Sequence, residues 1–472
     1  MLVRVMAADD HQLAEEVERL RSENAELKET VDKLTKQVEK LTAALEEARR
    51  AGKRQAAPFR KKTKPRKPKK PGRKPGDQYG NHTRRAVPAS DQITERHHVP
   101  LPGCCEHCEC KEIELGEPVV QYQIEMPAEP ICREFTIQTG CCQGCGRTVA
   151  GRHALQTSDA TGAAAVQLGP RLHAVMAWLN KRLGLSYGKI RQLLKELFGI
   201  SISRSTAARS CHRTARRCGP AHEQVRQDVR GSPQVVPDET GWRVGGGKAW
   251  LHEFAGLSEV AYVIDPTRSR TPAEQLLGLD WSGHLVHDGW SPYDAFGQAV
   301  HQQCNAHLIN RCNEMLETAT TGAARFPAAV KDLLQRGLAL RDRYLAGEAS
   351  THGLSVMAGR FTNELLCLVG VRKSNPDNER LANFLFEHHT SIFNYLRYPG
   401  MDATNWRGEQ AIRFGVVNRK VWGGNRTWDG AKTQSTLMSV VQTCVMRGLS
   451  PIRFLTDALT APKPLLIPAP LR

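Results

Sequence analysis

Three carboxylates stand at places in the sequence where side chains could hold a cation. Asp238 and Asp288 each end an apolar run typical of a buried strand and are followed by turn residues, so we expect both at strand ends that face a cleft. Glu409 begins a pattern that predicts a helix, with Ala411 and Ile412 on its apolar side. Mg²⁺ prefers oxygen ligands, and two such ions about 4 Å apart stabilise both oxygens of an in-line phosphoryl displacement. Together these residues predict chemistry on a phosphodiester.

Taken alone, each of the two aspartates also has a structural explanation, because an Asp near a turn commonly bonds the local backbone. The functional hypothesis therefore depends on the surrounding elements. Strands expected at 234–244, 248–255 and 260–265 predict an antiparallel meander. The elements that follow are a helix at 271–279, the strand before Asp288, a short helix from Ser291, a strand at 300–304 and a helix from Asn305. This order predicts a mixed sheet flanked by helices, as in the ribonuclease-H-like fold.

Four segments resemble the transposases of the insertion-sequence 66 family. They are 238–240 (Asp-Glu-Thr), 287–293 (His-Asp-Gly-Trp-Ser-Pro-Tyr), 304–308 (Cys-Asn-Ala-His-Leu) and 408–413 (Gly-Glu-Gln-Ala-Ile-Arg), the last followed by Lys420 and by Gly-Gly-Asn-Arg at 423–426. Since that family uses a DDE triad, the resemblance implies that Asp238, Asp288 and Glu409 bind Mg²⁺ or Mn²⁺ and are catalytic. It extends over most of the chain. Gln410 and Trp290 depart from the family's usual Arg and Tyr.

The charge of the chain points to a polyanionic partner. Its 472 residues carry a net charge of +17, which favours nucleic acid; a membrane surface or general solubility is the alternative. No apolar run reaches the length of about 18 residues that a membrane span needs. The start of the chain is too short and too quickly charged for a signal peptide. The length of the chain predicts several domains. The charge and the lack of a membrane span or signal peptide predict a cytoplasmic, nucleoid-associated protein without a membrane partner.

Residues 9–50 carry a heptad repeat. One core position holds Val17, Asn24, Val31, Val38 and Leu45, and the other holds Leu13, Leu20, Leu27, Leu34, Leu41 and Ala48. β-Branched residues at the first position with Leu at the second favour a parallel two-stranded coiled coil, in which a single Asn fixes the register. We expect a homodimer or a higher assembly through this leucine zipper. An amphipathic helix that packs within its own subunit is the alternative.

The linker at 53–90 is basic and rich in Pro. Its first part, 53–74, is almost all Lys, Arg and Pro, a composition that cannot bury a core but can displace counterions from DNA. The sequence Pro-Gly-Arg-Lys-Pro at 71–75 resembles an AT-hook core, whose Arg73 and Lys74 could enter a narrow minor groove. A solvated spacer between zipper and body is the alternative.

Residues 98–150 hold two Cys-x₂-Cys pairs, Cys105 with Cys108 and Cys142 with Cys145. Such pairs direct four thiolates at one tetrahedral Zn²⁺, and strands expected at 119–126 and 131–139 would complete a zinc-ribbon-like module. The gap between the pairs exceeds the usual length, and buried free thiols are the alternative. The cysteines that compete as ligands are Cys104, Cys110 and Cys141. The family resemblance also implies a Cys₄ zinc-binding domain here.

A helix-turn-helix region is expected at 160–218. After a turn at 199–202, Ser203 would cap a basic helix, and the N-terminal residues of such a helix reach base edges in the major groove. The base-edge candidates are Ser203, Arg204, Ser205 and Arg209. The candidates for phosphate contacts are Arg213, Arg216 and Arg217. A helical bundle with a solvated basic face is the alternative.

The remaining ranges complete a multidomain α+β chain. The ribonuclease-H-like α/β catalytic core is expected at 230–313 and, with closing helices, at 404–460. A helical insertion at 314–403, with helices at 324–346, 352–369 and 379–398, accounts for most of the long spacing, 409 − 288 = 121, between Asp288 and Glu409, and 461–472 form a tail. Arg413 and Lys420 could contact DNA near the metals, although basic surface helices are common.

These features and the resemblance predict a DNA transposase that binds the ends of an insertion sequence. It would catalyse metal-dependent strand cleavage and transfer into target DNA. The alternatives are a dimeric sequence-specific DNA-binding regulator and a nuclease without joining activity.

Overall fold

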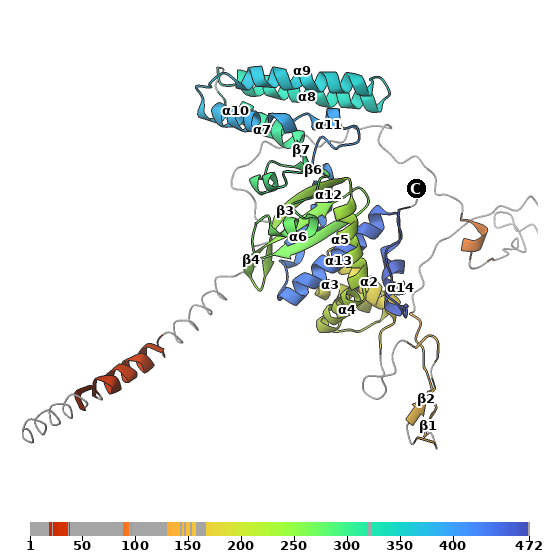
Figure 1. The fold of residues 1–472 in the computed structure, drawn as a ribbon. Coiled ribbons are helices and arrows are strands. Elements are labelled where there is room, and N and C mark those ends of the chain that lie inside the picture. The colour runs from red at the N-terminus through yellow and green to blue at the C-terminus, as the bar shows by residue number, and fades with distance from the viewer. Residues whose placement is uncertain are drawn as a thin grey trace, which may run out of the picture.

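The structure is a computed structural model. It describes residues 18–20, 22–35, 37, 88–93, 96, 130–141, 144–145, 148–151, 153–156, 167–319 and 322–470. Most of the core lies between residues 170 and 470, where a central sheet separates two groups of helices (Figure 1).

A five-stranded mixed sheet forms the centre, in the order β5-β4-β3-β6-β7. Its strands are β3 (Gln234–Val244), β4 (Gly247–Ala255), β5 (Val260–Asp265), β6 (His284–His287) and β7 (Val300–Gln303). β3, β4 and β5 form the predicted antiparallel meander, and β6 and β7 run parallel to β3. Gly245 and Gly246 both have positive φ, 57° and 77°, which a two-residue hairpin loop of type I′ requires. This loop fixes the register between β3 and β4.

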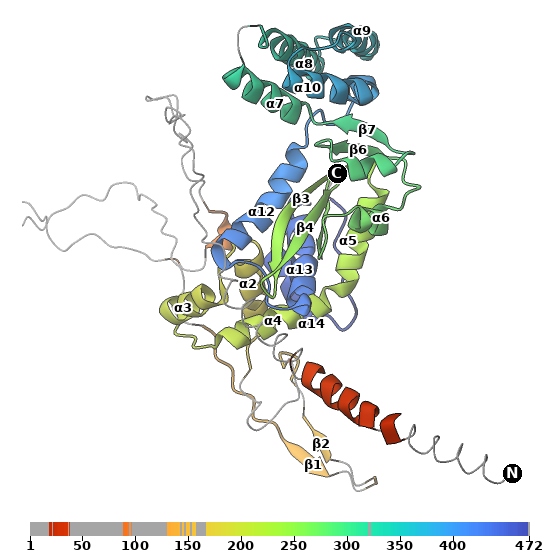
Figure 2. The ribbon, with the colours of Figure 1, turned by 90° about the vertical axis from the view of Figure 1, so that its left-hand side faces the viewer.

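Alternate residues of β3 face opposite sides of the sheet. Val235 packs with Val229 of α5 (Gly219–Gly231) in one core, and Val236 belongs to another. Trp242 lies in a third core, with Ile412 of α12 (Trp406–Trp422). Figure 2 shows α12 on one side of β3 and β4, and α5 with α6 (Thr271–Leu277) on the other. The site described below lies on the α12 side.

The long helix α13 (Trp428–Met446) covers the edge strand β5. The Ser439 hydroxyl accepts a hydrogen bond from the Tyr262 N–H at 2.9 Å, and the Thr443 hydroxyl accepts one from the Val260 N–H at 3.1 Å. These hydroxyls take the place of a sixth strand, because they satisfy backbone groups that an open edge would expose.

Four helices pack together at one end of the sheet (Figure 1). They are α2 (Pro170–Lys181), α3 (Tyr187–Phe198), α4 (Arg204–Arg217) and α14 (Pro451–Thr460). α3 ends at Gly199 with φ 64°, and Ser203 caps α4 by accepting the Thr206 N–H at 3.0 Å. The predicted helix, turn and capped basic helix are therefore present. α5 begins directly after the region predicted to be helical, with Pro220 in its first turn.

The helical insertion lies at the opposite end, beside β6 and β7 (Figure 1). Its helices are α8 (Arg325–Leu345), α9 (Thr351–Val369), α10 (Pro376–Glu387) and α11 (Asn394–Arg397). They follow α7 (Asn305–Thr318), most of which precedes the predicted insertion. The prediction of one helix at 379–398 is wrong. The chain leaves the helix at His388 because Gln302 of β7 binds the Ile392 carbonyl at 2.9 Å and the Tyr395 N–H at 3.0 Å. These contacts hold the segment against the sheet.

The N-terminal modules are described only in part. Residues 22–35 are helical, and Leu27 and Leu34 of the heptad repeat are 60% and 55% exposed. β1 (Thr139–Cys141) pairs with β2 (Thr148–Ala150). The strand expected at 131–139 is wrong over 131–138, which have no regular structure, and the one at 119–126 lies outside the described residues. Among the helices that the structure describes, none has the length and apolar character of a membrane span.

Candidate active site

Asp238 and Asp288 lie at the same level on neighbouring parallel strands. β3 pairs with β6 at Gln234 and Val235, opposite His284 and Leu285, so each Asp lies three residues beyond the last pair. Asp288 directly follows β6, as predicted. The expectation that Asp238 ends its strand is wrong, because β3 continues to Val244 as the partner of β4. Asp238 therefore lies in the middle of a strand, where it is half-buried, and Asp288 is exposed.

Glu409 lies in the first turn of α12, as predicted, and is exposed. Two glycines bring this helix close to the sheet. A Cβ on Gly408 would lie 3.2 Å from the Val236 carbonyl oxygen and 3.3 Å from the Asp238 Cβ, and one on Gly415 would overlap Leu251. Gly408 therefore sets the position of the neighbouring Glu409 over β3.

The carboxylates act on one another electrostatically. Burial raises the pKa of Asp238 to about 7, with the like charges of Glu239, Asp288 and Glu409 adding to the rise. A hydrogen bond from the Glu239 N–H to Asp238 Oδ1, 2.7 Å long, opposes the shift. These neighbours are all negative, so the site has the electrostatics of a cation-binding region.

The acids lie in one region, but their side chains do not converge on a single metal-binding position. Within the part of the chain that the structure describes, no group of three or more His, Cys, Asp or Glu side chains is arranged to hold a metal ion.

His307, at the start of α7, brings a basic group to the acids. Its Nε2 lies 3.9 Å from Glu409 Oε1. A hydrogen bond with Cys304 raises the pKa of His307 to about 9, and Asp288 and Glu409 add to the rise against the effect of burial. His307 was not among the predicted site residues, although it lies in one of the four resembling segments.

The family model described as "Transposase IS66 family" matches residues 165–433. This range is more than half of the chain and contains Asp238, Asp288 and Glu409. The chain belongs to the IS66 family of transposases. Membership implies a divalent metal cofactor and DNA as the partner. No curated protein matches the chain.

Glu239 of this transposase directly follows Asp238, and its carboxylate is bonded by side chains of the surrounding fold. Its side chain is 3% exposed and accepts hydrogen bonds from Arg268 Nε at 3.0 Å and from the Tyr293 hydroxyl at 3.2 Å. The Arg268 guanidinium lies over the rings of Trp250 and Trp290, at 5.1 and 4.9 Å. Glu239 therefore fixes a cluster of side chains beside the acids, which consists of Glu239, Arg268, Trp250, Trp290 and Tyr293 and which we call the wall of the site.

This wall also orients Asp288. The Trp290 N–H donates to Asp288 Oδ1 at 3.0 Å, and the Trp290 ring contacts Tyr293 at a right angle, 5.1 Å between centroids. Sequence alone did not reveal this cluster, because Arg268 and Tyr293 meet Glu239 only through the folded sheet.

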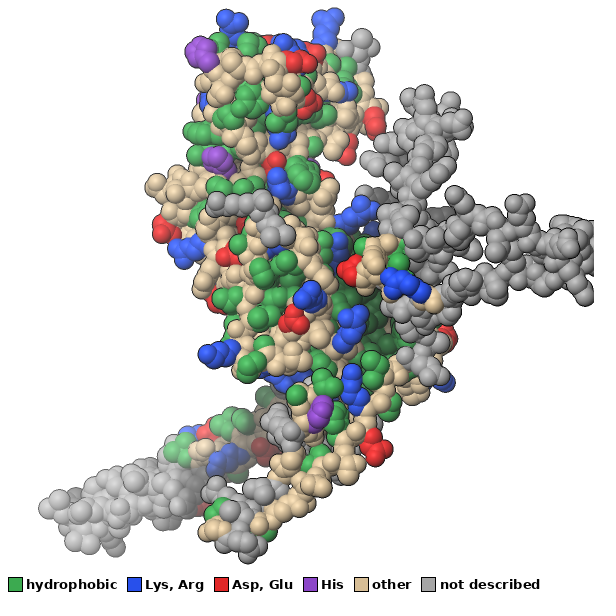
Figure 3. Space-filling model, turned by 90° about the vertical axis from the view of Figure 1, so that its right-hand side faces the viewer, with side chains coloured by type: hydrophobic (Ala, Val, Ile, Leu, Met, Phe, Trp, Pro, Cys, Tyr) green, Lys and Arg blue, Asp and Glu red, His purple; other side chains and the backbone are tan. Residues whose placement is uncertain are grey.

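The remaining predicted site residues fall into two groups. The candidates for DNA contact that the structure describes are all exposed: Ser203, Arg204, Ser205, Arg209, Arg213, Arg216, Arg217, Arg413 and Lys420. Arg73, Lys74, Cys105, Cys108 and Cys142 lie outside the described residues. Cys145 is exposed between β1 and β2. Lys and Arg side chains are spread over the face shown in Figure 3.

Arg217, one of the candidates for phosphate contacts, and Arg419 each join two elements of the fold. Arg217 donates to the carbonyls of Ala458, at 3.1 Å, and Ala461, which joins α4 to the end of α14. Arg419 donates to the Gly241 carbonyl and lies 3.3 Å from the Thr240 hydroxyl. Its guanidinium joins α12 to β3.

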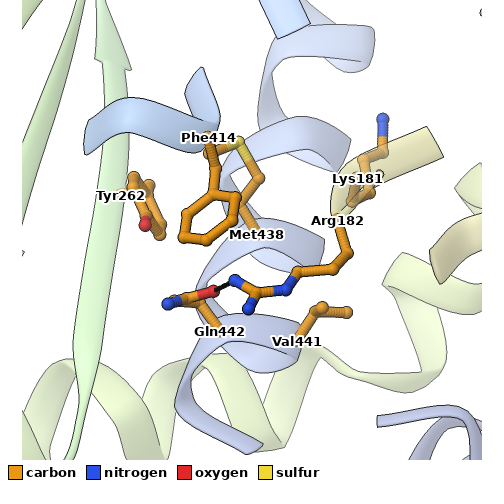
Figure 4. A pocket seen from close by; sticks show the side chains of 7 residues that line it. All are labelled: Lys181, Arg182, Tyr262, Phe414, Met438, Val441 and Gln442. Carbon is orange, nitrogen blue, oxygen red and sulfur yellow. Dashed lines mark hydrogen bonds between the residues drawn. The ribbon is translucent and has the colours of Figure 1, made fainter. Parts of the chain in front are cut away.

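The helices around α4 are connected to the helix that carries Glu409. Arg182, at the end of α2, lies 3.9 Å from the centroid of the Phe414 ring of α12 and donates to Gln442 of α13 (Figure 4). Asn418 of α12 donates to the Lys181 carbonyl at 3.1 Å. These contacts join α2 to α12 and α13.

Proposed function

We propose that this transposase binds the ends of an insertion sequence and catalyses metal-dependent cleavage and transfer of DNA strands. Asp238, Asp288 and Glu409 would be the catalytic, metal-binding residues. The observation that carries the proposal is their placement: two aspartates level on parallel strands, with Glu409 on a helix packed closely over them. The strand order, a meander followed by two parallel strands, supports a ribonuclease-H-like core.

The chemistry of the donor set suits Mg²⁺ or Mn²⁺. Three carboxylates offer only oxygen ligands, which these hard cations prefer, and the neighbours that act on Asp238 are all negative. Such ions would stabilise the attacking and leaving oxygens of an in-line displacement at phosphorus. The chain's own contribution is to orient Asp288 through the Trp290 N–H and Asp238 through the Glu239 N–H.

DNA binding would use both ends of the body. Ser203, Arg204, Ser205 and Arg209 are exposed at the start and middle of a capped basic helix, the part of a recognition helix that meets base edges. Arg413 and Lys420 are exposed on the helix of Glu409 and would contact phosphates near the reacting strand. Arg73 and Lys74 would add salt-dependent affinity through the basic linker.

The N-terminal modules would assemble the active complex. We infer that residues 9–50 pair two protomers, since the exposed Leu27 and Leu34 are heptad core positions. We infer that Cys105, Cys108, Cys142 and Cys145 bind Zn²⁺; Cys145 lies in the short loop of the β1–β2 hairpin, a common setting for a zinc-binding pair. We place the protein in the cytoplasm, at the nucleoid.

The test incubates purified protein with labelled element-end DNA and Mg²⁺. Wild type is compared with Asp238→Asn, Asp288→Asn and Glu409→Gln, and with Glu387→Gln, an exposed acid of α10, as the matched control. Loss of a cation ligand should slow cleavage at least about 1000-fold, since a bound cation supplies several kcal/mol. DNA binding, followed by a gel-shift assay, should persist in all variants.

The alternatives give different results. Triad variants that cut as fast as wild type would show that the catalytic residues are misassigned. Binding without cleavage by the wild type would favour a DNA-binding regulator. Cleavage without any joined product, in the presence of target DNA, would favour a nuclease.

A further inference from the structure

Glu253 of β4 lies directly opposite Asp238. The two residues are Cα partners in the antiparallel pair of β3 and β4, and directly opposed residues project from the same face of a sheet. Glu253 is fully buried, at 0% exposure. A fourth carboxyl group therefore lies under α12 beside the proposed catalytic residue.

This carboxyl has no bonding partner among the described residues. Neither Oε1 nor Oε2 of Glu253 makes a hydrogen bond, whereas buried polar atoms in proteins are nearly always bonded. An unpaired buried carboxyl opposes folding, so packing alone gives no reason for an acid at this position. Burial, with Asp238 as its charged neighbour, raises the pKa of Glu253 well above its usual range.

The Glu253 carboxyl group and the Asp238 side chain both border the space beneath Gly408 of α12. A Cβ built on Gly408 would lie 3.3 Å from Glu253 Oε2 and 3.3 Å from the Asp238 Cβ. Since residue 408 is a glycine, no α12 side chain at that position separates the two acids. Glu409, the next residue, follows from the same turn of the helix.

We propose that Glu253 is a fourth carboxylate of the metal centre, which contributes an oxygen to a divalent cation held with Asp238. The inference rests on the proposed function and adds a residue to its site. A cation would give the Glu253 oxygens the partner that the surrounding protein does not provide.

The experiment measures Mn²⁺ binding to the full chain by calorimetry and by the electron paramagnetic resonance of free Mn²⁺. The proteins compared are wild type, Glu253→Gln, Glu253→Leu, Asp238→Asn and the exposed control Glu387→Gln. We expect both Glu253 variants to weaken Mn²⁺ binding at least about 10-fold, the lower end of losses seen when groups that support a metal site are removed. Glu387→Gln should bind as wild type does.

Thermal unfolding shows whether Glu253 binds the cation or stabilises the fold. Without divalent ions, Glu253→Gln and Glu253→Leu should unfold at or above the wild-type temperature, because they remove an unsatisfied acid. The rise in unfolding temperature on adding Mn²⁺ should shrink in both. The Leu variant fills the buried position without polar atoms, so it provides a folded protein if Gln is not tolerated.

Two results would overturn the inference in distinguishable ways. Wild-type Mn²⁺ affinity in both Glu253 variants, with loss in Asp238→Asn, would exclude Glu253 and leave the proposed function intact. Wild-type affinity in Asp238→Asn as well would reject the metal centre and the inference together.

Discussion

Two buried acids near β3 differ in their partners. Asp402, 4% exposed, accepts hydrogen bonds from Arg407 Nε at 2.5 Å and Gln234 Nε2 at 2.7 Å. Glu253, on the neighbouring strand, has no bonding partner within the described chain. Burying a carboxylate is tolerated when ion pairs and hydrogen bonds replace water. The contrast separates an acid that maintains the fold from one whose partner is a ligand.

Asp402 also links the helical insertion to the helix that carries Glu409. Its carboxylate connects Gln234 at the start of β3, Arg341 of α8 at 3.7 Å and Arg407 in the first turn of α12. Glu409 lies two residues beyond Arg407. The paired acid therefore positions the helix that carries the third acid of the proposed triad, whereas Glu253 beside Asp238 has no such partner within the described chain.

The largest effect on folding is expected at the paired acid. Asp402→Ala should lower the free energy of unfolding by about 3 kcal/mol, because it leaves Arg407 and the Gln234 amide without their shared acceptor. Urea unfolding in the absence of divalent ions measures the change, with Glu253→Gln as the control that should lose little or nothing. Equal losses in the two variants would remove the distinction between the acids.

A pH series tests Asp238, the acid that lies beside the unpaired Glu253. Because the pKa of Asp238 in the folded protein, about 7, lies above its ordinary value of 3.8, the folded state holds this proton more tightly. The stabilisation is complete below about pH 4 and is lost as pH rises to about 7. The loss should total about 2 kcal/mol, allowing for solvent screening of a partly exposed group.

The measurement compares wild type with Asp238→Asn by urea unfolding in a chelating buffer from about pH 4 to about pH 8. The difference in the free energy of unfolding between the two proteins should change across this range, since Asn does not titrate. A difference that stays constant with pH would show that Asp238 ionises normally.

The sequence predicted the helices and strands better than it predicted which side chains contact one another. The strands β3 to β7 follow from apolar runs and turn residues, and Asp238 and Asp288 were found at the edges of such runs. Asp402 was missed because Gln234, 168 residues away, becomes its partner only after folding. Glu253 could have been found: a two-residue loop at Gly245-Gly246 pairs Val244 with Gly247, and the same register pairs Asp238 with Glu253.

The smallest effect is expected at Gly408, between the two acids and the helix. In Gly408→Ala the new methyl group would press on the Val236 carbonyl oxygen at 3.2 Å and on the Asp238 and Glu253 side chains. Overpacking costs about 1–3 kcal/mol, and the helix preference of Ala over Gly returns about 1, so a net loss of about 1 kcal/mol remains.

Gly359→Ala in α9 is the matched control, because a Cβ there meets nothing within 4 Å. It should stabilise the protein by up to about 1 kcal/mol. The two variants should therefore differ in sign in urea unfolding, and Gly408→Ala alone should also reduce Mn²⁺ affinity, since the methyl group would stand between Asp238 and Glu253. A stabilising Gly408→Ala with unchanged Mn²⁺ binding would mean that α12 can move away from the acids at no cost, and Gly408 would then not set the position of Glu409.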